Sequence, residues 1–205
     1  MKKAKSLLIF SAIFFLIIFL IILSQVLSYG YIKKVDYSIN EKITKFQTSN
    51  LIESAKILGA LTDTIPIIIF VIIIILLLYF KYDRVYSKLF VIFFLMNSLS
   101  FNIIKNLLEI SRPLNILIME KGFAYPSGHS TTAFFLFGFL LYLSNKYFKD
   151  NLRKILIIVF SILPIIIGFS RIYLNAHWFS DVLGGAILGL FWLSVFIYTR
   201  ISVKK

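Results

Sequence analysis

Long apolar runs alternate with short, mostly basic segments along this chain, and the runs predict membrane-spanning helices. A spanning helix needs roughly 20 mostly apolar residues, with some tolerance for tilt and polar flanks. Six runs come near that requirement: Leu7–Leu27, Ile65–Phe80, Leu89–Leu108, Thr131–Leu143, which lengthens to Gly128–Tyr147, Ile155–Ile172 and Val182–Tyr198. The expected fold is therefore an all-α membrane protein with six transmembrane helices.

Composition supports a lipid solvent. Hydrophobic residues make up 60 % of the chain and its mean hydropathy is +0.92, whereas soluble domains lie nearer half apolar. Six helices and their loops use up residues 1–205, which predicts a single integral membrane domain. The first run follows Lys2, Lys3 and Lys5 as in a signal peptide, but it is too long and lacks a small-residue cleavage site, so we expect a retained anchor.

The net charge of +13 is explained by its placement along the chain. Thirteen of the 22 Lys and Arg residues lie in the N-terminal segment, residues 81–88, residues 145–154 and residues 200–205. Short basic loops stay in the cytoplasm, so both termini are expected inside and loops 29–64, 109–127 and 170–181 outside. This bias indicates topology and attraction to anionic lipid heads, and excludes a nucleic-acid footprint. The absence of cysteine excludes disulfides and thiolate chemistry.

Two further patterns concern packing. The segment Val35–Phe46 predicts a short amphipathic helix on the outer surface, which either gates lateral access of lipids or packs over the bundle. Its apolar positions at helical spacing are Val35, Ile39, Ile43 and Phe46. Gly185 and Gly189 form a Gly-x3-Gly face in the last run, which favours close helix packing.

The third run ends in two cations on the outer side. Lys105 and Arg112 lie seven residues apart and would share one helical face if the helix continued to Arg112. Pro113 disfavours helix at Arg112 and predicts an exit there. One interpretation is a pair of snorkelling anchors. Basic residues are disfavoured on the outer side, however, and an ionisable residue among apolar neighbours is a functional candidate.

Pro126-Ser127-Gly128-His129 precedes the fourth run. Ser127 is placed to cap a helix, and Gly128 allows a ligand to approach the backbone closely. Free N–H groups at a helix start form an anion site. The alternative is an ordinary turn and cap, which His129 directly after the turn makes less favourable.

Ser170-Arg171 closes the fifth run, and His177 and Asp181 open the sixth. Their four-residue spacing predicts that His177 and Asp181 share one helical face. The carboxylate can then hold one ring N–H and leave the other nitrogen as a nucleophile, while Arg171 offers a planar fork to phosphate oxygens. The alternative is an interfacial histidine beside Trp178, with Asp181 as a helix N-terminal acid.

Together these segments resemble the signature of the type-2 phosphatidic-acid phosphatase family, which shares its site with vanadium haloperoxidases and some acid phosphatases. The pattern is Lys-x6-Arg-Pro, Pro-Ser-Gly-His and Ser-Arg-x5-His-x3-Asp, and all eleven fixed positions match between residues 105 and 181. Twelve residues separate the first two motifs and 40 separate the last two.

The resemblance implies a role for each matched residue. His177 would attack phosphorus and carry a phosphohistidine, Asp181 would orient it, and His129 would protonate the leaving oxygen. The groups expected to bind the phosphate oxygens are Lys105, Arg112, Arg171, Ser127 and the Gly128 N–H. No metal or other cofactor is implied, because three protein cations take the electrostatic role. Only Glu109 and Glu120 add carboxylates in the central outer loop.

The implied activity is hydrolysis of a lipid phosphate at the outer face of a bacterial cytoplasmic membrane. Candidate substrates are an isoprenoid diphosphate such as undecaprenyl diphosphate, phosphatidylglycerophosphate and phosphatidate, with envelope lipid recycling as the leading hypothesis by analogy. The expected partners are the lipid substrate and the bilayer, without nucleic acid, and no protein partner is predicted. Two rivals stay open: a lipid phosphotransferase of the same architecture, and a non-catalytic lipid-binding protein.

Overall fold

The computed structural model describes residues 2–203, which form helices joined by loops. In chain order these are α1 (Lys2–Leu27), α2 (Tyr31–Lys45), α3 (Ser49–Ala60), α4 (Thr64–Leu77), the π-helix η1 (Leu78–Tyr82), α5 (Arg84–Leu108), α6 (Gly128–Tyr147), α7 (Asp150–Tyr173) and α8 (Phe179–Val203). Lys204 and Lys205, which were counted with the cytoplasmic cations, lie outside the described residues.

All six predicted runs are helical, and five helices within residues 2–203 are long and apolar enough to cross a membrane. These five are α1, α4 with η1, α5, α7 and α8. The bounds of α6 match the lengthened prediction. Polar residues at both of its ends make α6 less apolar over a span length than these five helices, so it is not counted with them. It packs against α5, α7 and α8, so neighbouring helices shield much of its surface.

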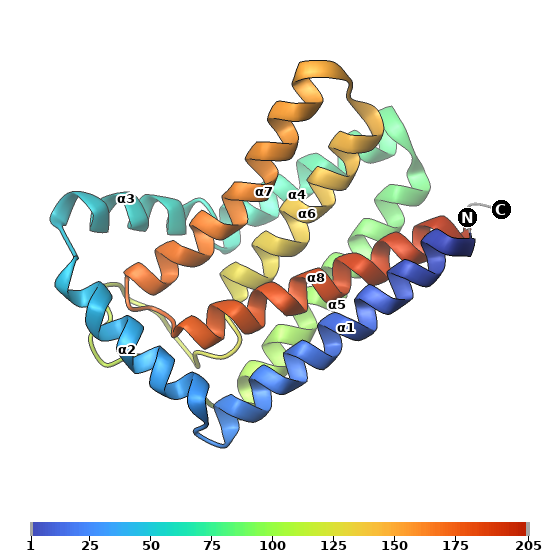
Figure 1. Ribbon diagram of the computed structural model, residues 1–205. Helices are drawn as coiled ribbons and strands as arrows, with labels where there is room; N and C mark the ends of the chain where they lie inside the picture. Colours follow the sequence, from blue (N-terminus) through green and yellow to red (C-terminus); the bar gives the residue numbers. More distant parts are fainter. Residues whose placement is uncertain (1, 204–205) are drawn as a thin grey trace.

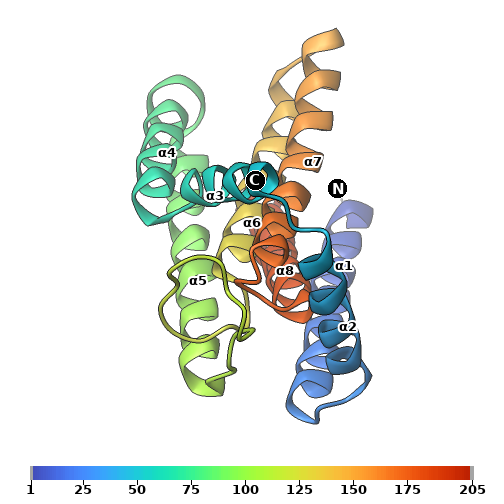
Figure 2. The same ribbon diagram turned by 90° about the vertical axis from the view of Figure 1, so that its left-hand side faces the viewer.

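The long helices run side by side, and the shorter ones cover one end of the bundle. α1 packs along α8, and α6 packs on both α8 and α7 (Figure 1). The start of α1 and the end of α8 lie together at the right of that view. Figure 2 looks onto the opposite end, where α2, α3 and segment 109–127 lie. This end is where the polar motifs meet.

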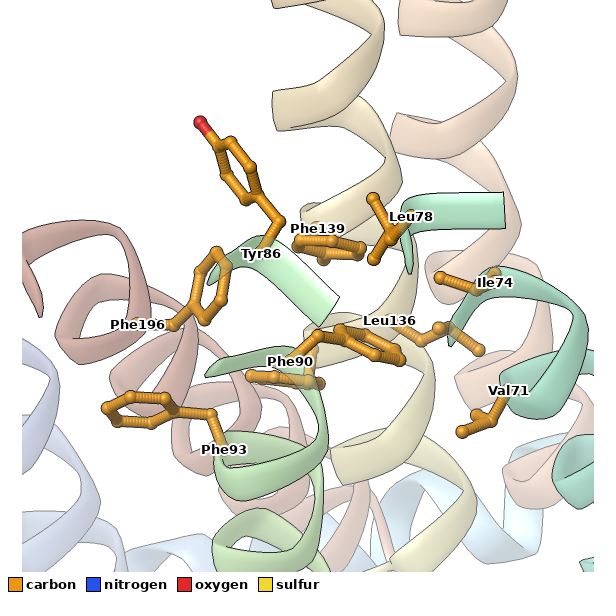
Figure 3. Close-up of a cluster of buried hydrophobic side chains, with 10 residues drawn as sticks. Val71, Ile74, Leu78, Tyr86, Phe90, Phe93, Leu136, Phe139 and Phe196 are labelled. Carbon is orange, nitrogen blue, oxygen red and sulfur yellow. The ribbon is translucent and has the colours of Figure 1, made fainter. Parts of the chain in front are cut away.

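A cluster of aromatic side chains joins α5, α6 and α8 inside the bundle (Figure 3). The ring of Phe139 stacks on that of Phe90 with centroids 4.5 Å apart and meets that of Phe196 edge-on at 5.1 Å. Such pairs stabilise a core beyond simple burial. This packing fixes how α5, α6 and α8 lie against one another in the half of the bundle away from the motifs.

The Gly-x3-Gly face brings α8 against the start of α6, as predicted. A Cβ atom on Gly185 would lie 2.6 Å from the Ser127 carbonyl oxygen, and one on Gly189 would lie 2.5 Å from the Thr131 carbonyl oxygen. Both obstacles are backbone atoms, which cannot give way as a side chain can. The two glycines therefore set how closely the Ser127 and Asp181 segments approach.

The amphipathic helix is confirmed as α2, and Val35, Ile39 and Ile43 of its predicted apolar face are half-buried. Its two fully buried residues, however, are polar and were not predicted. Lys33 and Asp36 are its buried residues, whereas Phe46 is 76 % exposed. Asp36 accepts hydrogen bonds from the backbone N–H of Ser180 at 2.8 Å and from its hydroxyl at 2.7 Å. Since this carboxylate holds the first turn of α8, the contact favours the packing interpretation of the helix over the gating one.

Helix α3 was not predicted, because its segment was assigned to an outer loop. Its sequence mixes polar and apolar positions, and its 12 residues are too few to span a membrane. Thr48 stands at its N-cap, where Ser, Thr, Asp and Asn are favoured, and this was the available signal. α3 packs against α7 and places Gly59 beside the Arg171 side chain.

Candidate active site

A cavity of about 510 Å³ opens between the first turns of α4 and α6 and the last turns of α5. Five of the predicted site residues line it: Lys105, Arg112, Gly128, His129 and His177. The other three do not line the cavity. Arg171 contacts Glu120 and Asp181 contacts His177, which both line it, and Ser127 directly precedes Gly128. The structure therefore brings all eight predicted residues to one place from three separate segments.

His177 lies in the loop before α8, so the prediction that it shares a helical face with Asp181 is wrong. α8 begins at Phe179, and only Asp181 belongs to its first turn. The two side chains still meet, with His177 Nδ1 3.4 Å from Asp181 Oδ2. The same carboxylate oxygen accepts the Trp178 backbone N–H at 2.8 Å. Asp181 is thus fixed by the loop and in turn orients the imidazole.

The other ring nitrogen of His177 faces the cations. His177 Nε2 lies 3.3 Å from Arg112 Nη1, and the side chain is 1 % exposed. Burial is the largest cause that lowers the pKa of His177 well below its ordinary value, followed by the charges of Arg112 and Lys105. The imidazole is therefore neutral near pH 7, with Nε2, the nitrogen expected to be the nucleophile, directed at the cavity side of the loop.

Arg112 also reaches the site from a loop. α5 ends at Leu108, where Glu109 adopts a left-handed conformation with φ of 51°, so Arg112 does not share a helical face with Lys105. Its guanidinium donates to the carbonyl oxygens of Ala176 at 2.7 Å and Gly122 at 3.0 Å. These bonds tie segment 109–127 to the loop that carries His177.

The Pro-Ser-Gly-His motif forms the start of α6, as predicted. Ser127 is the N-cap, and its hydroxyl accepts the Ser130 N–H at 3.4 Å. The Ser127 backbone N–H donates to the carbonyl oxygen of Asp181 at 3.0 Å, which links two motifs directly. A Cβ on Gly128 would lie 2.9 Å from the Phe101 ring. The motif therefore needs glycine both for packing and for ligand access.

Two carboxylates at the site were not predicted. Asp63 Oδ1 lies 3.1 Å from His129 Nε2, and its segment, Thr62-Asp63-Thr64 before an apolar run, carries the sequence signal of a helix cap. Glu120 forms ion pairs with Arg171 and, at 3.5 Å, with Arg112. Glu120 thus pairs with two of the three cations expected to bind phosphate. The sequence of its loop contains no pattern that predicts these ion pairs.

Replacing Glu120 by glutamine is expected to tighten phosphate binding several-fold. The neutral amide no longer neutralises Arg112 and Arg171, so an incoming phosphate does not have to displace an anion. The measurement is the inhibition constant of inorganic phosphate, together with KM. Glu109→Gln removes an exposed carboxylate from the same loop and should leave both constants unchanged. Equal effects of the two variants would show that general charge, rather than this contact, matters.

The fold and the cavity define a class of protein: an all-helical membrane protein whose polar pocket combines two histidines with three cations. The sequence model of the PAP2 superfamily matches residues 89–203, more than half of the chain, and the protein belongs to that superfamily. This confirms the resemblance that the eleven motif positions indicated.

Individual relatives of known sequence also support membership of the superfamily. Phosphatidylglycerophosphatase B of Bacillus subtilis is 35 % identical over 91 residues, which cover 43 % of this chain and 45 % of the relative. Lipid phosphate phosphatase 2 of Arabidopsis thaliana is 36 % identical over 80 residues, covering 36 % of this chain and 28 % of the relative. The aligned stretches thus span less than half of these curated relatives.

A solved structure shares the fold over nearly the whole chain. The crystal structure of the first transmembrane PAP2 type phosphatidylglycerolphosphate phosphatase from Bacillus subtilis superposes with a TM-score of 0.87. The match covers 96 % of this chain and 98 % of that chain at 24 % identity. The helical arrangement is therefore that of a membrane-embedded PAP2 phosphatase.

Proposed function

We propose that the protein, as a single membrane domain over residues 1–205, hydrolyses a lipid phosphate by transferring the phosphoryl group to His177. The observation that carries this proposal is the placement of His177. It is held by Asp181 on one side and faces Arg112 on the other, in a cavity that His129 also lines. A neutral, oriented imidazole beside fixed cations is the arrangement that phosphoryl transfer to histidine requires.

The reaction then has two steps. In the first, His177 Nε2 forms a bond to phosphorus, the bond from phosphorus to the lipid oxygen breaks, and His129 gives its proton to that oxygen. In the second, His129 takes a proton from water, the water oxygen attacks phosphorus, and the bond to Nε2 breaks. Inorganic phosphate and neutral His177 are released. Asp63, 3.1 Å from His129, stabilises the protonated form that the first step needs.

The charge that develops on the phosphoryl oxygens is met by protein groups. Lys105 and Arg112 line the cavity, and Arg171 adjoins it through Glu120. The Gly128 N–H is free at the start of α6, where the helix dipole also favours an anion. These groups take the place that a metal ion fills in other phosphatases, so we propose catalysis without a metal.

The cavity also supports a lipid as the substrate. Its wall toward the bilayer is apolar, formed by Ile67 and Ile68 of α4 and by Phe94, Leu95 and Phe101 of α5. A head group at His177 would therefore lie next to a hydrocarbon surface that accepts the tail. Because two of the relatives are named as phosphatases of phosphatidylglycerophosphate, we place this lipid ahead of undecaprenyl diphosphate and phosphatidate.

The proposed topology has six spans, namely the five apolar helices described above and α6. Both termini lie in the cytoplasm and the cavity faces outward. The support is the basic bias of residues 81–88 and 145–154, and the position of α1's start beside α8's end in Figure 1. The setting proposed is a bacterial cytoplasmic membrane.

The acid limb of the pH–rate profile is expected to lie below about 6.5, the ordinary pKa of histidine. The neutral form of His177 is the nucleophile, and its pKa is lowered, so activity persists as the pH falls below that value and is lost only at the lower pKa. Arg112→Gln removes a cation that lowers this pKa, so its limb should move upward. If the acid limb did not move, the ionisation that it reports would belong to another group, such as the phosphate of the substrate.

Phosphate release by purified protein in detergent, with chelator present, tests the proposed function. The substrates are phosphatidylglycerophosphate, undecaprenyl diphosphate and phosphatidate, and His177→Ala is the blank. Release that is lost in the blank supports hydrolysis through His177, and the order of kcat/KM gives the substrate class. Absence of release on all three, with phosphate passed to an added acceptor lipid, would instead establish the phosphotransferase.

A further inference from the structure

A second cavity, of about 200 Å³, lies at the end of the bundle opposite the candidate active site. It is formed by the last turns of α4 and η1, the last turns of α6 and the first half of α7. Ile74, Leu78, Leu143 and Phe160 are typical of its lining, and the only aliphatic hydroxyl among its lining residues is that of Ser144. Such a cavity suits hydrocarbon and offers almost nothing to a polar ligand.

The π-helix η1 shapes one wall of this cavity. It supplies Leu78 and Tyr82, and the five-residue turn ends where the Asp83 N–H bonds to the Leu78 carbonyl oxygen at 2.8 Å. A π-turn is wider than an α-turn and frequently occurs at functional sites. Leu77 and Tyr82 are 50 % and 40 % exposed, so this wall borders the surrounding bilayer.

Tyrosine rings and a lysine mark the polar edge of the cavity. The rings of Tyr82 and Tyr147 lie 4.7 Å apart, and both residues line it. The ammonium of Lys146 lies 4.7 Å from the centre of the Tyr147 ring and donates to the Tyr86 hydroxyl at 2.6 Å. Tyr86 projects its hydroxyl away from the aromatic cluster in Figure 3. The same ammonium lies 4.1 Å from the centre of the Tyr86 ring, so aromatic contacts hold the positive charge beside this edge.

Two more lysines are next in the chain to residues that line the cavity. Three exposed lysines are chain neighbours of lining residues: Lys81 beside Tyr82, Lys146 beside Tyr147 and Lys149 beside Phe148. Within residues 2–203 none of the three forms an ion pair with a carboxylate. The nearby Asp83 is already paired with Arg200 at 2.5 Å. The edge therefore carries uncompensated positive charge beside an apolar cavity.

We propose that this cavity binds one acyl chain of an anionic phospholipid whose head group lies on Lys81, Lys146 and Lys149. The chain fills an apolar space at the membrane surface of α4, α6 and α7, and the head group meets three lysines without carboxylate partners. A zwitterionic lipid fills the same space but brings a cation to the same lysines, so the site selects for negative charge. The occupant stabilises the junction of the three helices and takes no part in the reaction.

The test is thermal unfolding of the full chain in detergent with phosphatidylglycerol or phosphatidylcholine of identical acyl chains. A ligand that binds only the folded state raises the Tm, and we expect phosphatidylglycerol to raise it by about 2–4 °C more than phosphatidylcholine. The double variant Lys146→Gln, Lys149→Gln should lose this difference. The matched double variant Lys88→Gln, Lys154→Gln removes two exposed cations from the same end and should keep it.

Two further variants locate the bound lipid. Ser144→Leu fills the cavity from within, so its lipid-free Tm should hold while the lipid effect disappears. Arg112→Gln removes a cation from the catalytic cavity and should leave the lipid effect intact, which excludes binding there. Equal Tm shifts with both lipids, or a loss of the difference in the matched double variant, would overturn the proposal.

Discussion

His177→Ala is expected to lower kcat by about 10⁴-fold or more, the size of loss seen when a nucleophile is removed from a catalytic unit. The alanine leaves the cations and His129 in place but removes the imidazole whose Nε2 lies 3.3 Å from Arg112 Nη1. Binding of inorganic phosphate should therefore survive while turnover does not. Initial rates with phosphatidylglycerophosphate and a phosphate-binding titration measure the two effects separately.

Asn175→Ala is the matched control for this variant. Asn175 is buried in the same loop, but its amide bonds to Asn40, Thr44 and Asn115 on the side of α2. Its loss should lower the Tm, since three hydrogen bonds of about 1 kcal/mol each are lost and alanine disfavours the φ of 51° at this position. The kcat should stay within about tenfold. If both variants lost activity equally, the effect of His177→Ala would be one of loop structure rather than chemistry.

His129→Ala is expected to cost about 10²- to 10⁴-fold on a lipid phosphate, the usual contribution of a general acid. The loss should shrink to less than about tenfold on p-nitrophenyl phosphate, whose leaving group departs without a proton. His129 lines the cavity and is held by Asp63 at 3.1 Å, so it can reach the leaving oxygen. Rates on the two substrates, with wild type and variant side by side, give the ratio.

Thr132→Ala controls for a simple change in the shape of the cavity. Thr132 lines the same cavity one helical turn beyond His129, and its hydroxyl is far too weak an acid to protonate the leaving group. It should alter both substrates by the same factor. A loss with His129→Ala that did not depend on the leaving group would remove His129 from the role of acid.

Most of the fold followed from periodicity and length. The six apolar runs are all helices because a bilayer leaves the backbone few alternatives to internal hydrogen bonding. α3 was missed because its polar positions resemble those of a loop, and no span-length criterion applies to a helix of 12 residues. The buried polar residues of α2 were not predicted because Asp36 bonds to Ser180, a partner 144 positions away in the chain.

The site residues themselves were predictable, whereas their connections were not. Motif spacing identified all eight residues that meet at the cavity. Helix periodicity placed His177 on one helical face with Asp181, although it occupies the loop before α8. Pro113 indicated that the chain leaves the helix at Arg112, but not which distant carbonyl oxygens fix the guanidinium.

Asp63 and Glu120 were not predicted for a related reason. Asp63 contacts His129, 66 residues away, and Glu120 pairs with Arg171, 51 residues away. A local sequence pattern carries no information about such pairs.

The measurement that most directly tests phosphoryl transfer to His177 uses phosphatidylglycerophosphate labelled with ³²P at its terminal phosphate. The reaction is quenched in alkali, where a phosphorus–nitrogen bond survives, and the protein is digested and mapped. We predict label on the peptide that contains His177, labile to acid and absent from His177→Ala. Label on another peptide, or equal label in His177→Ala, would contradict the proposed mechanism.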